Sequence, residues 1–193
     1  MRVLSYEDAL AAVDARLGAK AAAHCRRVGE TAASLAVLYD VDPGRARLAG
    51  LLHDWDREQN ADELLQAASD ADMAVSDAEA AHPRLLHART GAAALPAALR
   101  GVPDDVAQAV ARHTVGCADM TPLDMVVYLA DMIEPQRDYP GVTELREAAG
   151  EVSLSELFAL GYQQSVLHIV LSRKRIHPDT VGVWNALVAG EPR

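Results

Sequence analysis

The sequence has few of the residues that stabilise small disulfide-linked or strand-rich proteins. Only 2 of its 193 residues are cysteine, and aromatic residues make up 4%. Two cysteines are too few for a disulfide framework and are typical of a reducing compartment. We find no strand-like alternation, internal repeat, glycine-rich phosphate loop or low-complexity tail. Because 50% of the residues are hydrophobic and alanine is abundant, we expect one all-α domain of closely packed helices.

The sequence also lacks an excess of positive charge. Its net charge is −10 and its pI is near 5.1, which argues against general binding of nucleic-acid polymers or of an anionic membrane. The first ten residues carry Arg2, Glu7 and Asp8 and no long apolar run, so they resemble neither a signal peptide nor a membrane segment. Cytoplasm is therefore the expected location. A polyphosphate ligand is still compatible, because metal ions and a few arginines can form a local positive site.

A histidine and an aspartate stand together at the end of an apolar run. Apolar residues at 48, 51, 52 and 55 share one helical face, and His53 and Asp54 border that face. A buried carboxylate needs a partner charge, hydrogen bonds or a metal. A structural aspartate that accepts a hydrogen bond is the commoner case, so this pair alone does not identify a site.

Four more polar residues border apolar faces in separate segments. They are His24, His87, His113 and Asp131. Four histidines and two aspartates in one core would need a shared cation to offset their loss of hydration. Such nitrogen and oxygen ligands suit iron, manganese, zinc or cobalt better than magnesium or calcium.

The order of these residues resembles the metal-binding pattern of the HD-domain phosphohydrolase superfamily. The surrounding segments read HCRRVGETAASLA, AGLLHDWDRE, HPRLLHARTGA, ARHTVG and VYLADMIEPQRDYPGVTELREAA, which is similar to the YqeK branch, the bacterial symmetrical diadenosine tetraphosphate hydrolases. The resemblance runs from about residue 20 to the end and is most specific from His113 to Arg146. It implies a helical bundle with a di-metal site in its core.

The resemblance implies a set of ligands for each of two metal ions. His24, His53, Asp54 and Asp131 would hold one ion and Asp54, His87 and His113 the other, with Asp54 bridging the two. Iron is the first expectation, and manganese, cobalt or zinc are alternatives. His53, Asp54 and Asp131 would be catalytic, and a metal-bound hydroxide would cut diadenosine tetraphosphate in its middle to give two ADP.

The same resemblance suggests substrate contacts. Arg137 comes first, because it lies in a Glu-Pro-x-Arg segment six residues after Asp131. Arg27 and Arg57 follow proposed ligands at helical spacing, although both could be ordinary surface arginines. Relatives often have lysine at the position of Arg57. The remaining candidates are Thr114 and the run Arg173, Lys174 and Arg175, which could equally complement a helix dipole.

The expected helices divide the chain into three parts. An N-terminal helix lies within residues 1–18, the ligand-bearing helices within 19–134, and a substrate loop with the C-terminal helices within 135–193. We expect helices at 6–17, 19–39 and 43–57, one that starts at Pro83 and bears His87, and one that bears His113. Further helices are expected at 122–134, with Thr121 as its cap, at 153–173, and from a cap at Asp179 to about Ala189. Residues 60–81 should form one or two short exposed helices. Apolar positions 157, 160, 167 and 171 should pack inward.

Several alternatives stay open at this stage. Another HD-domain activity, such as a nucleotidase or a guanosine-tetraphosphate hydrolase, would fit the same motif. So would an inactive nucleotide-binding module or a metal-free interaction domain. Cys25 and Cys117 could form a zinc site with nearby histidines, while His82 and His168 are expected not to be ligands. The helix at 153–173 could present a homodimer face, or its apolar stripe could belong to the core.

Overall fold

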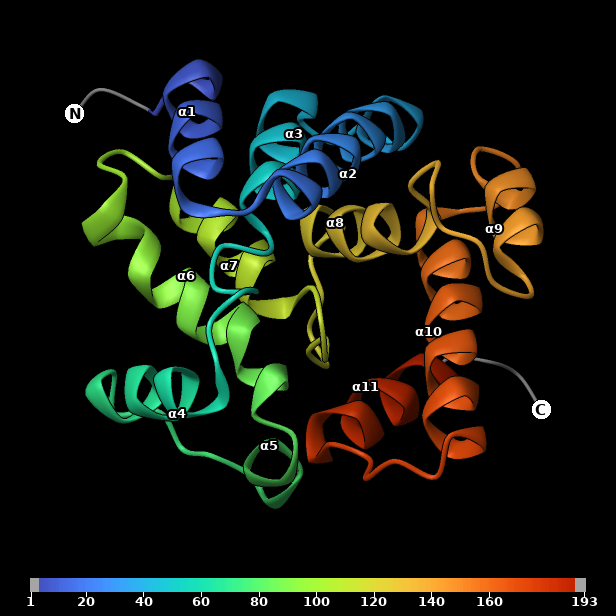
Figure 1. Cartoon of the computed structure of the whole chain (residues 1–193). Coiled ribbons are helices and arrows are strands. Elements are labelled where there is room, and N and C mark those ends of the chain that lie inside the picture. The colour runs from blue at the N-terminus through green and yellow to red at the C-terminus, as the bar shows by residue number, and fades with distance from the viewer. Residues whose placement is uncertain (1–3, 190–193) are drawn as a thin grey trace.

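The protein is entirely helical over the residues that its computed structural model describes, 4–189. These residues form eleven α-helices and one 3-10 helix, with no strand among them, which confirms the predicted all-α fold (Figure 1). The helices are α1 (Tyr6–Arg16), α2 (Ala19–Leu38), α3 (Pro43–Leu52), α4 (Ala61–Asp70), α5 (Asp77–Ala81), η1 (Pro83–Leu86), α6 (His87–Ala98), α7 (Asp104–Arg112), α8 (Pro122–Ile133), α9 (Val142–Ala148), α10 (Leu154–Leu171) and α11 (Pro178–Ala189). No described helix is both long and apolar enough to span a bilayer.

The packing of α2 against α3 sets the centre of the bundle. A Cβ atom at Gly50 would lie 2.9 Å from the Cα atom of Gly29, so the two helix backbones approach closely only because both residues are glycine. α8 packs on both of these helices, and α7 packs on α3 and α8. This crossing brings the middle of α2 next to the end of α3, where the histidine and aspartate motif lies.

Two helices end earlier than the sequence suggested. The helix expected at 43–57 stops at Leu52, and residues 53–58 continue as turns. The imidazole Nδ1 of His53 lies 2.7 Å from the carbonyl oxygen of Gly50, and the next backbone bonds span three residues, such as Trp55 N to Leu52 O. α7 likewise ends at Arg112, directly before His113. Both ligand candidates therefore lie at helix ends.

Proline has different effects at three positions. Pro122 begins α8 directly after its cap Thr121, as predicted, and Thr121 forms a capping box with Asp124. Pro83 begins a 3-10 turn, and α6 starts only at His87. Pro96 lies inside α6. Since α6 ends two residues later, Pro96 removes a hydrogen bond only from the last turn.

The short helices α4 and α5 agree with the prediction for residues 60–81. Leu64, Ala68 and Leu86 are buried together, with Leu65 and Met73 packed against them, as a small cluster separate from the main core. Figure 1 shows α4 and α5 on the side of α6 away from α1.

The prediction for the apolar stripe on α10 was largely wrong. Leu157 is buried, but Leu160, Leu167 and Leu171 are exposed. α10 packs into the core through Leu157, Phe158, Gly161 and Tyr162, all in its first half. Its second half is the wall of a pocket. α11 also begins differently, because the backbone N–H of Asp179 donates to His177 Nδ1 at 3.1 Å, so His177 rather than Asp179 caps it.

Candidate metal centre

The six residues predicted as metal ligands converge in the middle of the bundle. α2 supplies His24, the turn after α3 supplies His53 and Asp54, and the start of α6 supplies His87. His113 follows α7, and Asp131 lies on α8. His53, Asp54, His87 and His113 are each at most 5% exposed. Segments far apart in the sequence thus meet at one point of the core.

Asp54 lies at the centre of this cluster. Its Oδ1 atom is 3.0 Å from His87 Nε2 and 3.7 Å from His113 Nε2. Its Oδ2 atom is 3.4 Å from His53 Nε2 and 3.9 Å from His24 Nε2. Each carboxylate oxygen therefore faces its own pair of imidazole nitrogens.

Asp131 closes one side of the cluster. Its Oδ1 atom lies 3.0 Å from His24 Nε2 and 3.8 Å from His53 Nε2. Potential ligand atoms of His24, His53 and Asp131 all lie within 4.8 Å of one another, and so do those of His53, Asp54 and His113. His87 joins the second group through its 3.2 Å contact between Nε2 and His113 Nε2.

The histidine rings are oriented by hydrogen bonds at their other nitrogen. Nδ1 of His53, His87 and His113 lies 2.7, 2.5 and 2.7 Å from the carbonyl oxygen three residues earlier. A carbonyl only accepts, so Nδ1 carries the proton and Nε2 presents a lone pair to the centre. This is the arrangement that metal-binding histidines adopt in proteins.

The close approach of the central nitrogen and oxygen atoms is more favourable with a cation between them than without one. Nε2 of His87 and His113 are both acceptors at 3.2 Å, and His87 Nε2 faces the Asp54 carboxylate at 3.0 Å. His53 Nε2 and Asp54 Oδ1 are buried without a hydrogen-bond partner. Lone pairs this close repel unless a positive charge lies between them, so the residues present match a transition-metal site.

The surroundings of the two aspartates favour their ionised form, which is the form that binds a metal ion. Burial acts to raise the pKa of Asp54, but the charge of a protonated His53 and hydrogen bonds from His113, His53 and His87 hold that pKa well below its ordinary value. Burial acts to lower the pKa of His53, but Asp54 raises it well above its ordinary value. Asp54 therefore needs a positive charge beside it, which either a proton or a metal ion on the histidines can supply. The pKa of Asp131 is likewise lowered, because the His24 hydrogen bond and the nearby charges outweigh burial. Burial lowers the pKa of His113. Ionised carboxylates and a neutral imidazole are the protonation states that bind metals.

Three of the predicted substrate residues border the cluster. Arg137 donates from Nε to the Asp131 carbonyl oxygen at 2.7 Å and also bonds the Asp131 carboxylate. Arg57 Nη1 is 3.5 Å from His87 Nε2, and Thr114 Oγ1 is 3.0 Å from His113 Nε2. These side chains can reach a group bound at the centre.

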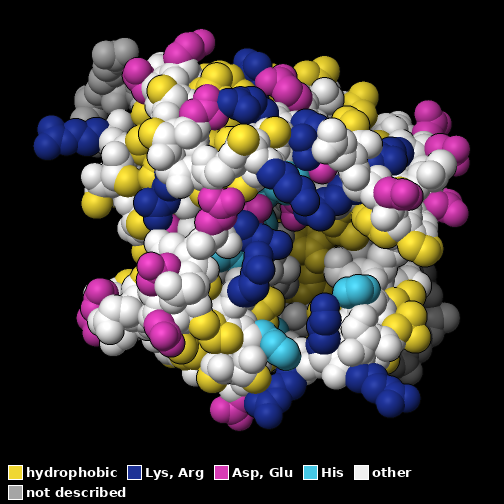
Figure 2. All heavy atoms as spheres, viewed as in Figure 1, with side chains coloured by type: hydrophobic (Ala, Val, Ile, Leu, Met, Phe, Trp, Pro, Cys, Tyr) yellow, Lys and Arg dark blue, Asp and Glu magenta, His cyan; other side chains and the backbone are white. Residues whose placement is uncertain are grey.

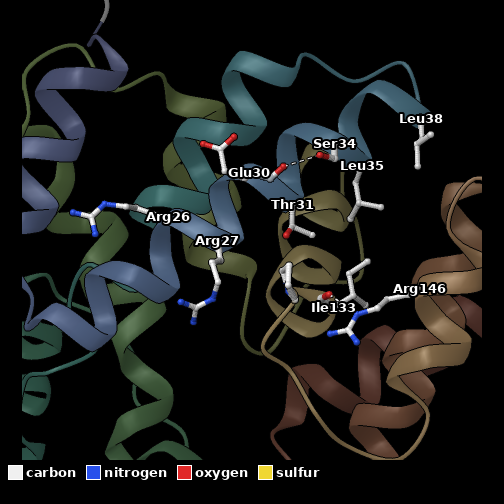
Figure 3. A pocket seen from close by; sticks show the side chains of 10 residues that line it. Arg26, Arg27, Glu30, Thr31, Ser34, Leu35, Leu38, Ile133 and Arg146 are labelled. Atoms are coloured by element: carbon white, nitrogen blue, oxygen red, sulfur yellow. Dashed lines mark hydrogen bonds between the residues drawn. The ribbon is translucent and has the colours of Figure 1, made fainter.

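Arg27, the fourth predicted substrate residue, forms an ion pair with Glu134. Its Nε donates to Oε2 of Glu134 at 2.7 Å, and Glu134 Oε1 lies 3.2 Å from His24 Nδ1. Arg27 lines a groove of about 680 Å³ between α2 and the end of α8, called here the outer groove, together with Thr31, Leu35 and Ile133 (Figure 3). The sequence did not single out Glu134. Its position three residues after Asp131, directly before a proline, was the available signal.

Two pockets adjoin the centre at Thr114. The tyrosine pocket, about 660 Å³, is lined by Tyr128, Tyr139, Tyr162, Arg137, Leu167 and His168. The basic pocket, about 260 Å³, is lined by His82, Arg84, Lys174, Arg175 and His177. Figure 2 shows Lys and Arg side chains around a hollow with a hydrophobic inner wall. Lys174 and Arg175 are thus brought beside the site, whereas Arg173 lines neither pocket.

The histidines and cysteines set aside by the sequence analysis stay outside the cluster. Within residues 4–189, neither cysteine joins a group of three potential metal ligands, so the cysteine–histidine zinc alternative gains no support. His82 and His168 are exposed and line the two pockets. The sequence missed the pocket tyrosines, which are spread over three segments with no common spacing.

The fold and the centre define an all-helical protein with a buried histidine–aspartate metal site. The HD domain family matches residues 21–136. The chain belongs to this family, and its relatives include proteins named symmetrical bis(5'-nucleosyl)-tetraphosphatase. The Bacillus subtilis protein of that name is 30% identical, covering 97% of this chain and all of that protein. The Halalkalibacterium halodurans one is 31% identical, covering 86% of this chain and 87% of that protein.

A solved structure gives the same result. A Clostridium acetobutylicum protein, described as a predicted HD superfamily hydrolase involved in NAD metabolism, superposes with a TM-score of 0.90 at 29% sequence identity. The match covers 98% of this chain and all of that one. The resemblance drawn from the sequence is confirmed.

Proposed function

We propose that this protein is a metal-dependent hydrolase that cuts diadenosine tetraphosphate in its middle to give two ADP. The relatives named above support the reaction. The observation that carries the proposal is the geometry of Asp54, whose two oxygens each face a pair of histidine Nε2 atoms. A bridging carboxylate between two ligand sets is what a dinuclear phosphohydrolase requires.

His24, His53, Asp54 and Asp131 would hold one ion, and Asp54, His87 and His113 the other. Iron is our first assignment, with manganese, cobalt or zinc as alternatives. When bound, such a pair lowers the pKa of coordinated water and offsets the negative charge on phosphate. The carbonyl bonds at Nδ1 keep His53, His87 and His113 in the tautomer that binds. HD-domain proteins are metal-dependent, and the ligand set here agrees with that.

Arg137 and Arg57 would bind and orient the phosphates. The Arg137 side chain is 40% exposed while its guanidinium contacts Asp131, so one edge can still face a ligand. Arg57 is 42% exposed and lies near both Asp54 and His87. An arginine fork matches the oxygens of a phosphate, and its charge stabilises the polyanion that leaves. Thr114 can donate from its hydroxyl to the same group.

The tyrosine pocket is our candidate for one nucleoside, because aromatic and apolar walls suit a base. The basic pocket would receive phosphate oxygens through Lys174 and Arg175. Arg27 and Arg173 lose support as direct contacts: the first is paired with Glu134, and the second lines neither pocket.

Three wider proposals go with this function. Residues 1–193 would act as one HD-type domain, in which residues 135–193 add the substrate loop and pockets to the ligand-bearing helices. Cytoplasm is our proposed location, since both cysteines are free. Leu160 of α10, which is exposed and does not line the tyrosine pocket, marks a face that a homodimer could use, which sedimentation can test.

A product assay tests the reaction. Purified protein of known metal content is incubated with diadenosine tetraphosphate, and the nucleotides are separated by chromatography. We expect ADP as the sole nucleotide product and about two metals per chain. AMP together with ATP would reject the symmetrical cut. No turnover with metals bound would reject this substrate, and guanosine tetraphosphate and nucleoside monophosphates would then be tested as substrates.

A further inference from the structure

His24 is held in a different way from the other three histidines of the centre. His53, His87 and His113 direct Nδ1 to a backbone carbonyl oxygen. His24 directs Nδ1 to a carboxylate, with 3.2 Å to Oε1 of Glu134. The difference has a local cause.

Helix position decides which acceptor is available. His53 and His113 follow the last residues of α3 and α7, where carbonyl groups are free of helical bonds. His87 follows a 3-10 turn, and the Arg84 carbonyl oxygen lies near both its backbone N–H and its Nδ1. His24 lies inside α2, where the neighbouring carbonyls bond to the next turn of the helix. Its Nδ1 proton therefore needs an acceptor from another element.

The end of α8 supplies that acceptor. Glu134 leaves the helix with φ −52° and ψ 151°, as expected for a residue before proline. Arg146 Nη2 donates to its carbonyl oxygen at 2.7 Å and fixes the backbone. One turn earlier, Asp131 Oδ1 lies 3.0 Å from His24 Nε2. Residues 131 and 134 thus contact both nitrogens of one ring.

Glu134 is also placed to remain ionised without solvent. Its exposure is 2%, and its second oxygen accepts from Arg27 Nε at 2.7 Å and from the Gln136 backbone at 2.9 Å. Figure 3 shows Arg27 projecting from α2 beside the outer groove. Arg27, Glu134 and His24 therefore form a chain of charge and hydrogen bonds from the surface to the cluster.

We propose that Glu134 is a positioning residue for the metal site of His24, His53 and Asp131. It accepts the Nδ1 proton of His24, so that Nε2 faces the ion, and its charge strengthens this nitrogen as a ligand. Partners of this kind typically change metal affinity by about 10- to 100-fold. The inference rests on the proposed metal centre and is independent of which nucleotide is cleaved.

Cobalt titration tests the role without measuring hydrolysis. Metal-stripped protein is titrated with Co²⁺, and binding is followed by calorimetry and by the visible absorption of the ion. We expect two sites in the wild type, one of which is weakened about 10- to 100-fold in Glu134→Gln. Glu79→Gln is the matched control, because Glu79 is also buried and bound to an arginine but lies outside the cluster. It should bind Co²⁺ like the wild type.

Two further variants separate positioning from simple stability. Arg27→Met leaves the contact between Glu134 and His24 in place and should keep both Co²⁺ sites. In a His24→Ala background, Glu134→Gln should cause no additional loss of affinity, because the two residues act as a unit.

Unchanged Co²⁺ binding in Glu134→Gln would overturn the inference, and so would an equal further loss in the double variant or the loss of a site in Arg27→Met. If Glu134→Gln does not fold, as judged by circular dichroism, Glu134→Asp takes its place. It keeps the charge but shortens the side chain that reaches His24 Nδ1, so it should weaken the same Co²⁺ site, and unchanged binding would overturn the inference. Absence of Co²⁺ binding by the wild type would instead overturn the metal centre.

Discussion

Buried acids inside this protein fall into two groups. Among the described residues, Asp56, Glu79, Asp124 and Glu134 are at most 2% exposed, and each carboxylate bonds an arginine, namely Arg16, Arg89, Arg112 and Arg27. Asp54 is 5% exposed and is surrounded by imidazole nitrogens instead. Its nearest arginine contact is 3.9 Å, to Arg57.

The difference shows how a buried carboxylate that needs a cation from outside the protein can be separated from one that the protein itself satisfies. An arginine supplies both charge and donors, so the acid it binds is satisfied within the protein itself. Histidines whose Nδ1 atoms donate to carbonyls offer only lone pairs, so Asp54 still needs a cation. The unpartnered Oδ1 atom of Asp54 is the direct sign of that need.

Replacing Asp54, the buried acid that no arginine pairs with closely, should have the largest effect. We expect Asp54→Asn to lose both metals, or to bind them weakly, and to lower turnover by on the order of 10⁴-fold. An amide has one acceptor oxygen and no charge, so it cannot bridge two cations. Metal analysis and the ADP product assay check this on protein whose fold is verified by circular dichroism. A turnover rate near that of the wild type would exclude the two-metal arrangement.

Arg137 sharpens the comparison because it pairs with a carboxylate of the cluster, Asp131, while remaining 40% exposed. We expect Arg137→Ala to keep the metals and to reduce kcat/KM by about 10²-fold, through lost stabilisation of phosphate charge. Arg45→Ala is the control, since Arg45 forms an exposed pair with Asp105. If Arg137→Ala loses metal instead, then Arg137 supports the ligand Asp131 and does not bind substrate.

Sequence reasoning could select the six candidate ligands because each one borders an apolar helical stripe and their order resembles the pattern of a known family. The spacing of His113 from Val106 and Val110 is an example, and all six ligand candidates meet in the structure. A buried polar residue is a local signal that needs no knowledge of its partners. The all-α fold followed from composition and helix-capping residues for the same reason.

Contacts between segments that are distant in the sequence were not predictable. Glu134 bonds Arg27 across 107 positions, and no spacing rule links them. The stripe on α10 has helical periodicity, yet Leu167 and Leu171 are exposed because only the first half of that helix meets the core. Periodicity marks a face of a helix, but the neighbouring elements determine how much of that face is covered.

The smallest effect on hydrolysis is expected from replacing Glu79, a buried acid that is paired with an arginine. Burial acts to raise its pKa, but hydrogen bonds from the Ser76 backbone and from Arg89 outweigh it and lower the pKa below the ordinary 4.5. A lowered pKa means that this stabilisation is complete above about pH 4.5 and is lost as the pH falls through the folded-state value. Glu79→Gln should therefore lose about 1–3 kcal/mol of stability at neutral pH, with hydrolysis unchanged.

Unfolding experiments from pH 7 to pH 3 check this prediction. The difference in stability between wild type and Glu79→Gln should stay constant at neutral pH and become smaller in acid, because Glu79 itself becomes protonated there. Glu30→Gln serves as the control, since the Glu30 and Arg47 pair is exposed and should contribute less than about 1 kcal/mol. If Glu79→Gln lowers turnover as Asp54→Asn does, pairing with arginine does not distinguish the acids that the protein satisfies from those that need a cation.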